Sequence, residues 1–424
     1  MTLLKTNLFY SFFLLLIVTC TGRREGLVAD PENDGLILPP GFSALVVAKS
    51  VGPARHIVVD DDGTIYVSLR EKYNGGGIVV LKDHDGDGRA EDIRYSGNCQ
   101  GTGIELYENY LYFATDTSVI RFRINGEGEP SADFETIITG YPLEYQHSAK
   151  TFTFDDAGNI YVNVGAPSNA CAEEDRAPGS KGMDPCPILN NFGGIWRYKA
   201  NVPNQVHMKD GSRFATGIRN AVAIQWNHYN NHLYIVMHGR DQLYPQYKEN
   251  FTENDNTNLP AEEFFLVNEG DNFGWPYCYY DPFKNKKVLS PEYGGDGEIV
   301  GRCDSMKNPI MAFPAHYAPN DLLFYEGDQF PKKYRHGAFI AFHGSWNRAP
   351  DMQKGYNIVF VPFGGNLPSG NWEVFADNFA GIDPIPSPGD AKHRPCGLSL
   401  GPDGSIYVVD SKFGRIWRIF YEGK

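Results

Sequence analysis

The 424-residue chain is 42% hydrophobic and 14% aromatic, and it carries a net charge of −14. This apolar content excludes an intrinsically disordered chain, and the acidic balance argues against a nucleic acid partner, because binding to a phosphate backbone depends on basic patches. The 46 glycines and 28 prolines, together with the aromatic residues, are typical of many short strands joined by tight turns.

The first 20 residues have the features of an export signal. Lys5 precedes an uncharged apolar run at residues 8–18, which is too short for a comfortable membrane span. The run ends in Ile-Val-Thr-Cys, which is similar to the lipobox of bacterial lipoproteins. We therefore expect an exported protein, periplasmic or at the cell surface, whose only membrane attachment is a lipid anchor on Cys20. An ordinary cleaved signal peptide is the alternative.

The rest of the chain repeats one hairpin pattern. In three stretches, a short apolar strand, an acidic turn with Gly and a second apolar strand follow one another, as in HIVVDDDGTIYVSLR. Two looser copies and one more diverged unit bring the number of repeats to six. Because one strand pair cannot bury its own faces, such repeats must pack radially. We predict an all-β protein, a six-bladed β-propeller with four-stranded antiparallel blades. The six repeats begin at His56, Ile104, Phe152, Val222, Asp321 and Leu398.

The strand SALVVAKS, from Ser43 to Ser50, precedes the first repeat. We expect it to complete the last blade beside RIWRIFY, from Arg415 to Tyr421, and so to close the ring. No segment shows sustained helical periodicity. The long insertions at 165–195, 240–262 and 275–320 are candidate binding loops. The predicted organisation is a signal peptide at 1–20, a linker at 21–38 and one propeller domain at 39–424.

The cysteines fit an oxidising compartment, since six remain when the one in the export signal is set aside. The sequence leaves open whether Cys99 and Cys396 meet. The other four flank two loops and are expected to form the disulfides Cys171–Cys186 and Cys278–Cys303.

An acidic loop from Asp83 to Asp92 has the spacing of a calcium-binding loop. Carboxylates alternate at Asp83, Asp85 and Asp87, with glycine at the sharp turn. The glutamate that usually stands twelve positions from the start is replaced by Arg94. Two interpretations stay open, a structural calcium loop and a solvated acidic hairpin tip, and neither makes this segment catalytic.

Arginine and histidine recur at equivalent positions of the repeats. In a propeller, the residues that enter each innermost strand line one mouth of the central channel. One such side chain usually has a structural role, but several together favour a flat, multiply anionic ligand, because arginine binds carboxylates bidentately. The strand entries carry Arg55, His56, Gln100, His147, Arg219, Asn220, Asn320, His393 and Arg394, and the hairpin exits add Arg70, Gly239, Arg240, Asp241, Trp346, Asn347, Arg348 and Lys412.

Seven segments match one known family in order and cover nearly all of the chain after the signal. The chain resembles the soluble glucose/sorbosone dehydrogenase family, whose members are sugar dehydrogenases that depend on pyrroloquinoline quinone (PQQ). It is more similar to the sorbosone/pyranose branch of this family than to the soluble glucose dehydrogenase itself. The segments are LPPGFSALVVAKSVGPARHIVV, QHSAKTFTF, FATGIRNAVAIQW, VMHGRDQL, NFGWPYC, FIAFHGSWNR and HRPCGLSLGPDGSIYVVDSKFGRIWRI.

The resemblance implies the cofactors PQQ and Ca²⁺ and roles for individual residues. His147 matches the catalytic histidine, which takes a proton from the anomeric hydroxyl while hydride passes to the quinone. Arg219 and Asn220 match the pair that contacts the quinone, with Arg219 stabilising the charge on its reduced oxygen. Gly239 and Arg240 match the loop whose carbonyl oxygens bind calcium, an ion that polarises the quinone as a Lewis acid.

Other positions depart from the family pattern. Arg240 stands where the glucose enzyme has proline, and the following Asp241 could add a carboxylate to the metal site. Arg394 matches an arginine that binds a PQQ carboxylate, but Cys396 stands where the glucose enzyme has a second one. The remaining candidates for cofactor contacts are Arg348, Lys412 and Arg55.

The leading hypothesis is therefore a quinoprotein that oxidises an aldose or a sugar-like aldehyde, with a small-molecule sugar as substrate and an external electron acceptor. One alternative is a non-catalytic cell-surface propeller that binds a glycan or a partner protein at the same mouth. A calcium-dependent lactonase-type hydrolase is a third hypothesis, but it would need several carboxylates around an axial metal. Nucleotide cofactors are disfavoured, because no Gly-x-Gly-x-x-Gly motif or phosphate loop occurs.

Overall fold

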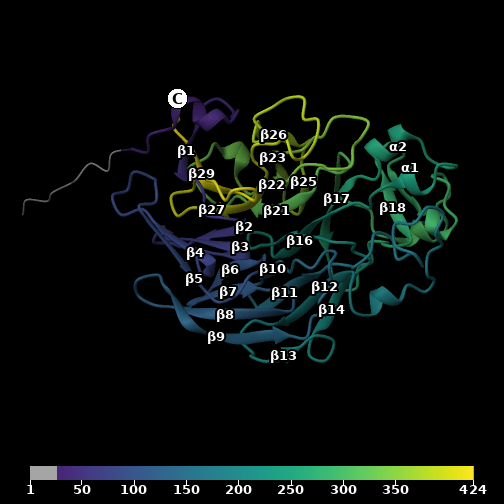
Figure 1. Ribbon diagram of the computed structural model, residues 1–424, viewed down its shortest axis with the longest axis horizontal. Coiled ribbons are helices and arrows are strands. Elements are labelled where there is room, and N and C mark those ends of the chain that lie inside the picture. The colour runs from purple at the N-terminus through teal and green to yellow at the C-terminus, as the bar shows by residue number, and fades with distance from the viewer. Residues whose placement is uncertain (1–25, 424) are drawn as a thin grey trace, which may run out of the picture.

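Each of the six predicted repeats forms the two innermost strands of one antiparallel sheet in the computed structural model, which describes residues 26–423. The sheets stand around a common axis, and their innermost strands contact one another in cyclic order β2, β6, β10, β15, β21 and β27. The six-bladed propeller is confirmed (Figure 1). The export signal, with Cys20, lies outside the described residues.

The strands of each blade follow one another from the channel outward. The first three blades are β2 (Ala54–Val59), β3 (Ile65–Tyr73), β4 (Gly76–Lys82) and β5 (Asp92–Ser96); β6 (Ile104–Tyr107), β7 (Tyr110–Ala114), β8 (Ser118–Ile124) and β9 (Pro130–Thr139), extended by β13 (Gln205–Val206); and β10 (Phe152–Phe154), β11 (Asn159–Val164), β12 (Gly194–Lys199) and β14 (Ser212–Thr216). The other three are β15 (Ala223–Asn227), β16 (His232–Met237), β17 (Glu262–Val267) and β20 (Met311–Phe313); β21 (Pro319–Phe324), β22 (Ala338–Phe342), β23 (Asn357–Val361) and β26 (Glu373–Ala376); and β27 (Pro395–Leu400), β28 (Ile406–Asp410), β29 (Ile416–Tyr421) and β1 (Phe42–Ala48).

The turns of the repeats explain why their strands fold back. In the first blade, Gly63 has φ +89° and its N–H donates to the Asp60 carbonyl oxygen at 2.9 Å. Gly158 and Gly404 occupy the matching turns with φ +75° and +84°, a region that glycine enters without steric cost. Apolar residues of the strands then pack between neighbouring blades, where Tyr161 stacks on Trp226 with ring centroids 5.3 Å apart.

The ring closes as the sequence predicts. Strand β1 pairs antiparallel with β29, with Phe42 opposite Tyr421, so the last blade combines strands from both ends of the propeller (Figure 1, purple beside yellow). Part of the segment expected to be a linker also packs on the propeller. Asp30 forms an ion pair with Arg89 at 3.1 Å, and Asp34 accepts a hydrogen bond from the Trp417 indole at 2.9 Å.

Insertions between the strands gather on one side of the propeller, at the right of Figure 1. Both predicted disulfides are confirmed, Cys171–Cys186 in the first insertion and Cys278–Cys303 in the third, whereas Cys99 and Cys396 are free and buried. Among the described residues, no helix is long and apolar enough to span a bilayer. The remaining elements are α1 (Leu243–Gln246), α2 (Glu253–Asn258), β18 (Cys278–Asp281), β19 (Lys286–Leu289), β24 (Phe363–Gly364), β25 (Leu367–Pro368) and five short 3₁₀ turns at Pro31–Gly35, Pro187–Asn190, Pro291–Tyr293, Gly301–Ser305 and Lys332–Tyr334.

Candidate functional site

A cavity of about 300 Å³ opens at the end of the channel where the innermost strands begin. The residues around it come from the segments that precede β10, β15 and β21 and from the loops that follow β11, β16 and β22, so several blades contribute to one site. Its wall is formed by Gln146, His147, Arg176, Arg219, His238, Gly239, Asp241, Glu262, His316, Ala318, Trp346 and Asn347.

His147 is held as a neutral base. Its Nδ1 lies 2.5 Å from the Ala166 carbonyl oxygen, and because a carbonyl only accepts, Nδ1 carries the hydrogen and Nε2 keeps its lone pair. Burial and then the charge of Arg219 lower the pKa of His147 to about 3. Gly165 makes room for this arrangement, because a Cβ there would lie 2.8 Å from His147 Cβ and 2.7 Å from Asn220 Oδ1.

Arg219 is buried in the wall of the same cavity and pairs with a carboxylate. Its Nη2 lies 2.9 Å from Asp241 Oδ2, which also accepts from Arg176 at 3.0 Å, while Asp241 Oδ1 accepts from Asn347 at 2.8 Å. Burial alone would raise the pKa of Asp241, but Arg219, His316 and Arg176 outweigh it and lower the pKa to about 2. Asp241 therefore stays ionised, and both of its oxygens are engaged by protein donors.

A second positive group adjoins the cavity. Arg394 donates to the His343 and Gly344 carbonyl oxygens at 3.0 and 2.6 Å, and Arg55 Nη1 lies 4.0 Å from Cys396 Sγ. Burial, followed by Arg394 and Arg55, lowers the pKa of His343 well below its usual value. His238, which lines the cavity, lowers the pKa of both His343 and His147, so it is near enough to each of them to interact electrostatically.

Seven of the ten predicted site residues lie in or near the cavity. His147, Arg219, Gly239 and Asp241 line the cavity. Asn220 lies beside it, where its Oδ1 accepts from Asn163 at 3.1 Å. Arg55 and Arg394 belong to the adjoining basic group.

The side chains of Arg240, Arg348 and Lys412 are directed elsewhere. Arg240 pairs with the buried Glu292 and donates to Gln246 at 2.9 Å. Arg348 donates to two main-chain oxygens, those of Thr257 and Ala315, at 2.9 and 3.1 Å, and exposed Lys412 binds the carbonyl oxygens of residues 389 and 391. Each of these cations therefore fastens a loop, and in the described chain none of the three side chains is part of the cavity wall.

Several residues of the site were not among the candidates, and His238, Glu262 and Asn169 are three of them. His238 directly precedes Gly239 within the VMHGRDQL segment, which was the available signal. Glu262, at the start of β17, accepts from the Gly239 and Ala318 amides at 2.7 and 3.1 Å, and burial raises its pKa to about 8. Asn169, in the first insertion, bonds both Arg219 and Asp241. No repeat position marks Glu262 or Asn169 in the sequence.

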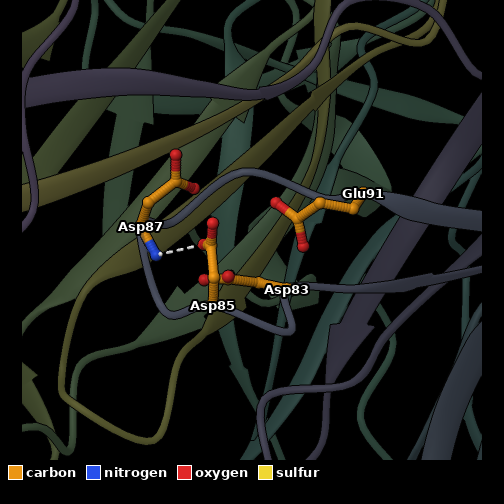
Figure 2. A group of neighbouring side chains, drawn as sticks. All are labelled: Asp83, Asp85, Asp87 and Glu91. Carbon is orange, nitrogen blue, oxygen red and sulfur yellow. Dashed lines mark hydrogen bonds between the residues drawn. The ribbon is translucent and has the colours of Figure 1, made fainter.

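The acidic loop between β4 and β5 is separate from this site. Asp83, Asp85, Asp87 and Glu91 each bring one carboxylate oxygen within 4.8 Å of the others, and Figure 2 shows the four side chains around one turn. Glu91 takes the place expected for Asp92, which pairs instead with Arg94 at 2.6 Å. This geometry is compatible with both interpretations of the sequence, a structural calcium loop and a solvated acidic turn.

Comparison with known proteins gives a family match over residues 36–422, to the family described as TrAA12-like. A protein of Borreliella burgdorferi, described as uncharacterized, is 24% identical over 433 residues, which are 99% of this chain and 100% of that protein. A PQQ-dependent pyranose dehydrogenase of Coprinopsis cinerea is 28% identical over 191 residues, but these span 38% of this chain and 25% of that enzyme.

A solved structure, the holo form of the pyranose dehydrogenase PQQ domain from Coprinopsis cinerea, superimposes with a TM-score of 0.73. The alignment covers 91% of this chain and 97% of that domain, at 18% sequence identity. At this level of identity the superposition establishes a shared fold.

Proposed function

Because the chain belongs to the TrAA12-like family, within a group of propellers that resemble PQQ-dependent sugar dehydrogenases, we propose that it oxidises an aldose or related sugar with PQQ and calcium. The observation that carries the proposal is His147, a neutral imidazole with a free Nε2 in a cavity beside a buried arginine. A base next to a fixed positive charge suits the oxidation of a sugar, because the hydroxyl proton must be removed while hydride leaves the carbon.

The residues around the cavity fit a flat, anionic cofactor. Arg55 and Arg394 would bind its carboxylates, and Arg219 and Asn220 would contact the quinone. His238 Nδ1 is a buried polar atom without a hydrogen-bond partner among the described residues, so it is available to a ligand. When bound, PQQ supplies the acceptor for hydride.

The calcium ion would be held by main-chain oxygens. Within the described chain, no donor is bonded to the carbonyl oxygen of Gly239 or Arg240, whereas the Asp241 carboxylate is engaged by Arg219, Arg176 and Asn347. We therefore assign the calcium contacts to the two carbonyl groups, which suit a hard cation, and assign Asp241 to charge compensation.

The protein's own residues would manage the proton and the charge. The Ala166 carbonyl fixes the tautomer of His147, so Nε2 is the atom that takes the proton from the substrate hydroxyl. The low pKa keeps this nitrogen unprotonated in the free protein, and an anionic ligand beside it would raise that pKa and make it a stronger base. Arg219 would stabilise negative charge that develops on the ligand.

Replacement of the base tests the proposal. We expect His147→Ala to bind PQQ with calcium as the unaltered protein does, but to lose about 10²- to 10⁴-fold in kcat, the usual contribution of a general base. Dye reduction with a panel of aldoses measures kcat, and the absorption spectrum of the quinone measures binding and reduction. His228→Ala is the matched control, because His228 is half-exposed and pairs with Asp156 on a hairpin turn.

Two outcomes would contradict the proposal. Full activity of His147→Ala would remove His147 from its role. A lack of PQQ binding and of quinone reduction with every sugar would instead favour a glycan- or protein-binding propeller at the same mouth.

The cellular setting is part of the same proposal. The disulfides Cys171–Cys186 and Cys278–Cys303 fit an oxidising compartment, so we propose that the protein acts after export, with an external electron acceptor. A lipid on Cys20 would keep it at the membrane surface. Mass spectrometry of the mature N-terminus distinguishes a lipidated cysteine from ordinary signal cleavage.

A further inference from the structure

Asn169 is a buried amide, 1% exposed, in the insertion between β11 and β12. Its Oδ1 accepts hydrogen bonds from Arg219 Nη2 at 3.1 Å and from the Asp241 main-chain N–H at 2.9 Å. Its Nδ2 donates to the Asp241 carbonyl oxygen at 3.0 Å. The side chain therefore closes a two-point contact with the main chain of residue 241 and reaches Arg219 at the same time.

The main chain of Asn169 adds two more bonds. Its carbonyl oxygen accepts from Arg219 Nε at 3.2 Å and from the indole N–H of Trp275 at 2.9 Å. One residue thus joins the first insertion to the strand entry of the fourth blade, to the loop at 239–241 and to the third insertion. The disulfide at Cys171, two residues away, fastens this part of the insertion.

These bonds fix the direction of the Arg219 guanidinium. Nε and Nη2 are held by Asn169 and Asp241, and Nη1 is left without a hydrogen-bond partner among the described residues. Because the guanidinium is planar, fixing two of its nitrogens also fixes where the third points. Arg219 lines the cavity, so its remaining donors are those available to a ligand.

We propose that Asn169 is a positioning residue that sets the cofactor-contacting arginine and the calcium-binding loop in one geometry. This inference rests on the proposed function, and it adds a residue that touches neither the quinone nor the metal. It follows that affinity for PQQ and affinity for calcium are coupled through Asn169, and that its loss lowers both.

Three variants test this role. Asn169→Ala removes all the side-chain bonds. Asn169→Asp keeps the acceptor for Arg219 and for the Asp241 N–H but loses the donor to the Asp241 carbonyl oxygen. Ser168→Ala is the matched control in the same insertion, because Ser168 bonds Asp175 and the Cys171 N–H and touches neither Arg219 nor the 239–241 loop.

Spectroscopic titration gives the PQQ and calcium concentrations at half-saturation. We expect Asn169→Ala to raise both by about tenfold or more, the effect of losing a hydrogen bond to a charged group. Asn169→Asp should keep PQQ affinity closer to that of the unaltered protein while still requiring more calcium. Ser168→Ala should change neither value by more than about twofold.

Amide hydrogen exchange of the cofactor-free protein gives a readout independent of PQQ. Exchange of the peptide covering 238–242 should accelerate in Asn169→Ala and not in Ser168→Ala, because only the first variant frees the Asp241 N–H. Unchanged exchange and unchanged half-saturation would overturn the inference, as would an equal effect of Ser168→Ala. If Asn169→Ala fails to fold, an unchanged calcium requirement in Asn169→Asp overturns it.

The unaltered protein separates this inference from the proposed function. If it binds no PQQ, the proposed function fails, and the hydrogen-exchange comparison still decides whether Asn169 holds the loop.

Discussion

Asp241 illustrates how one carboxylate can organise several positive groups. Arg219 and Arg176 reach the same oxygen at 2.9 and 3.0 Å, and His316 Nδ1 lies 3.9 Å from the other. The two arginines come from different loops, and without their shared counter-ion their neighbouring charges would repel one another. Asp241 thus stabilises the basic mouth before any anionic ligand arrives.

We expect Asp241→Asn to lower the free energy of unfolding by about 3 kcal/mol or more, because the amide keeps the shape but leaves the buried cation of Arg219 without its partner. Urea denaturation measures the change. Glu373→Gln is the control, since Glu373 pairs with Lys333 on the exposed surface and such pairs contribute about 1 kcal/mol or less. Equal stability of Asp241→Asn and the unaltered protein would contradict this role.

At single positions, the sequence predicts which types of residue gather at the mouth better than it predicts where each side chain points. His147 and Arg219 could be found because equivalent positions of the repeats converge on one mouth. Arg348 and Lys412 occupy similar positions, but the paths of their loops turn them to main-chain carbonyl groups. Asn169 and Glu262 were missed because their roles depend on contacts between insertions, which follow no repeat.

Among the elements, the third insertion is fastened to the fourth blade by a buried ion pair. Lys287 in β19 lies 2.5 Å from Glu263 in β17, with side-chain exposures of 1% and 3%, and it also donates to the Phe273 carbonyl oxygen at 2.7 Å. Two charges so deeply buried are stable only together. The pair therefore fixes where the insertion sits beside the candidate calcium loop.

We expect Lys287→Met to cost about 3–5 kcal/mol of unfolding free energy, because it leaves a buried carboxylate without its partner. The double variant Lys287→Met/Glu263→Leu should recover most of that loss, since neither charge remains to be desolvated. Denaturant unfolding of the two variants gives the comparison. If the double variant is less stable than the single one, the pair contributes more than mutual neutralisation of its two charges.

The elements were predicted to different degrees. The six hairpins were found because alternation of apolar residues is a local signal, strengthened in three of them by an Asp-containing turn with Gly, and they appear as β2–β3 through β27–β28. The insertions were recognised only as loops. The helices α1 and α2 have four and six residues, too few for a helical period to appear in the sequence.

On the scale of the whole molecule, the carboxyl groups and the histidines buried along the channel give stability opposite dependences on pH. Burial raises the pKa of Glu105 to about 8 and that of Asp321 to about 7, and it lowers the pKa of His56 and of His238 to about 4. Between about pH 4 and 6.5 the two histidines are less protonated in the folded state than in the unfolded state. Their effect is therefore to lower the stability of the folded state as pH falls. The carboxyls hold extra protons in the folded state up to about pH 8, so they destabilise it as pH rises.

We therefore expect the melting temperature to fall between pH 6.5 and 8, where Glu105, Asp321 and Glu262 together outweigh the opposite effect of Lys150, whose pKa burial lowers to about 8. Calorimetry of the cofactor-free protein across this range measures it. Glu105→Gln should reduce the slope, because the amide stays neutral at every pH. A melting temperature that rises with pH over this interval, or an unchanged slope in Glu105→Gln, would contradict the prediction.

The pairing of β1 with β29 also sets an order for biosynthesis. Residues 42–48 are among the first of the propeller to leave the ribosome, yet their partner strand is synthesised some 370 positions later, a separation that makes loop closure slow. Until then the first-made strand has an unpaired edge that can recruit other chains. A nascent chain interrupted before residue 416 would therefore be a substrate for chaperones or proteases rather than a smaller closed propeller.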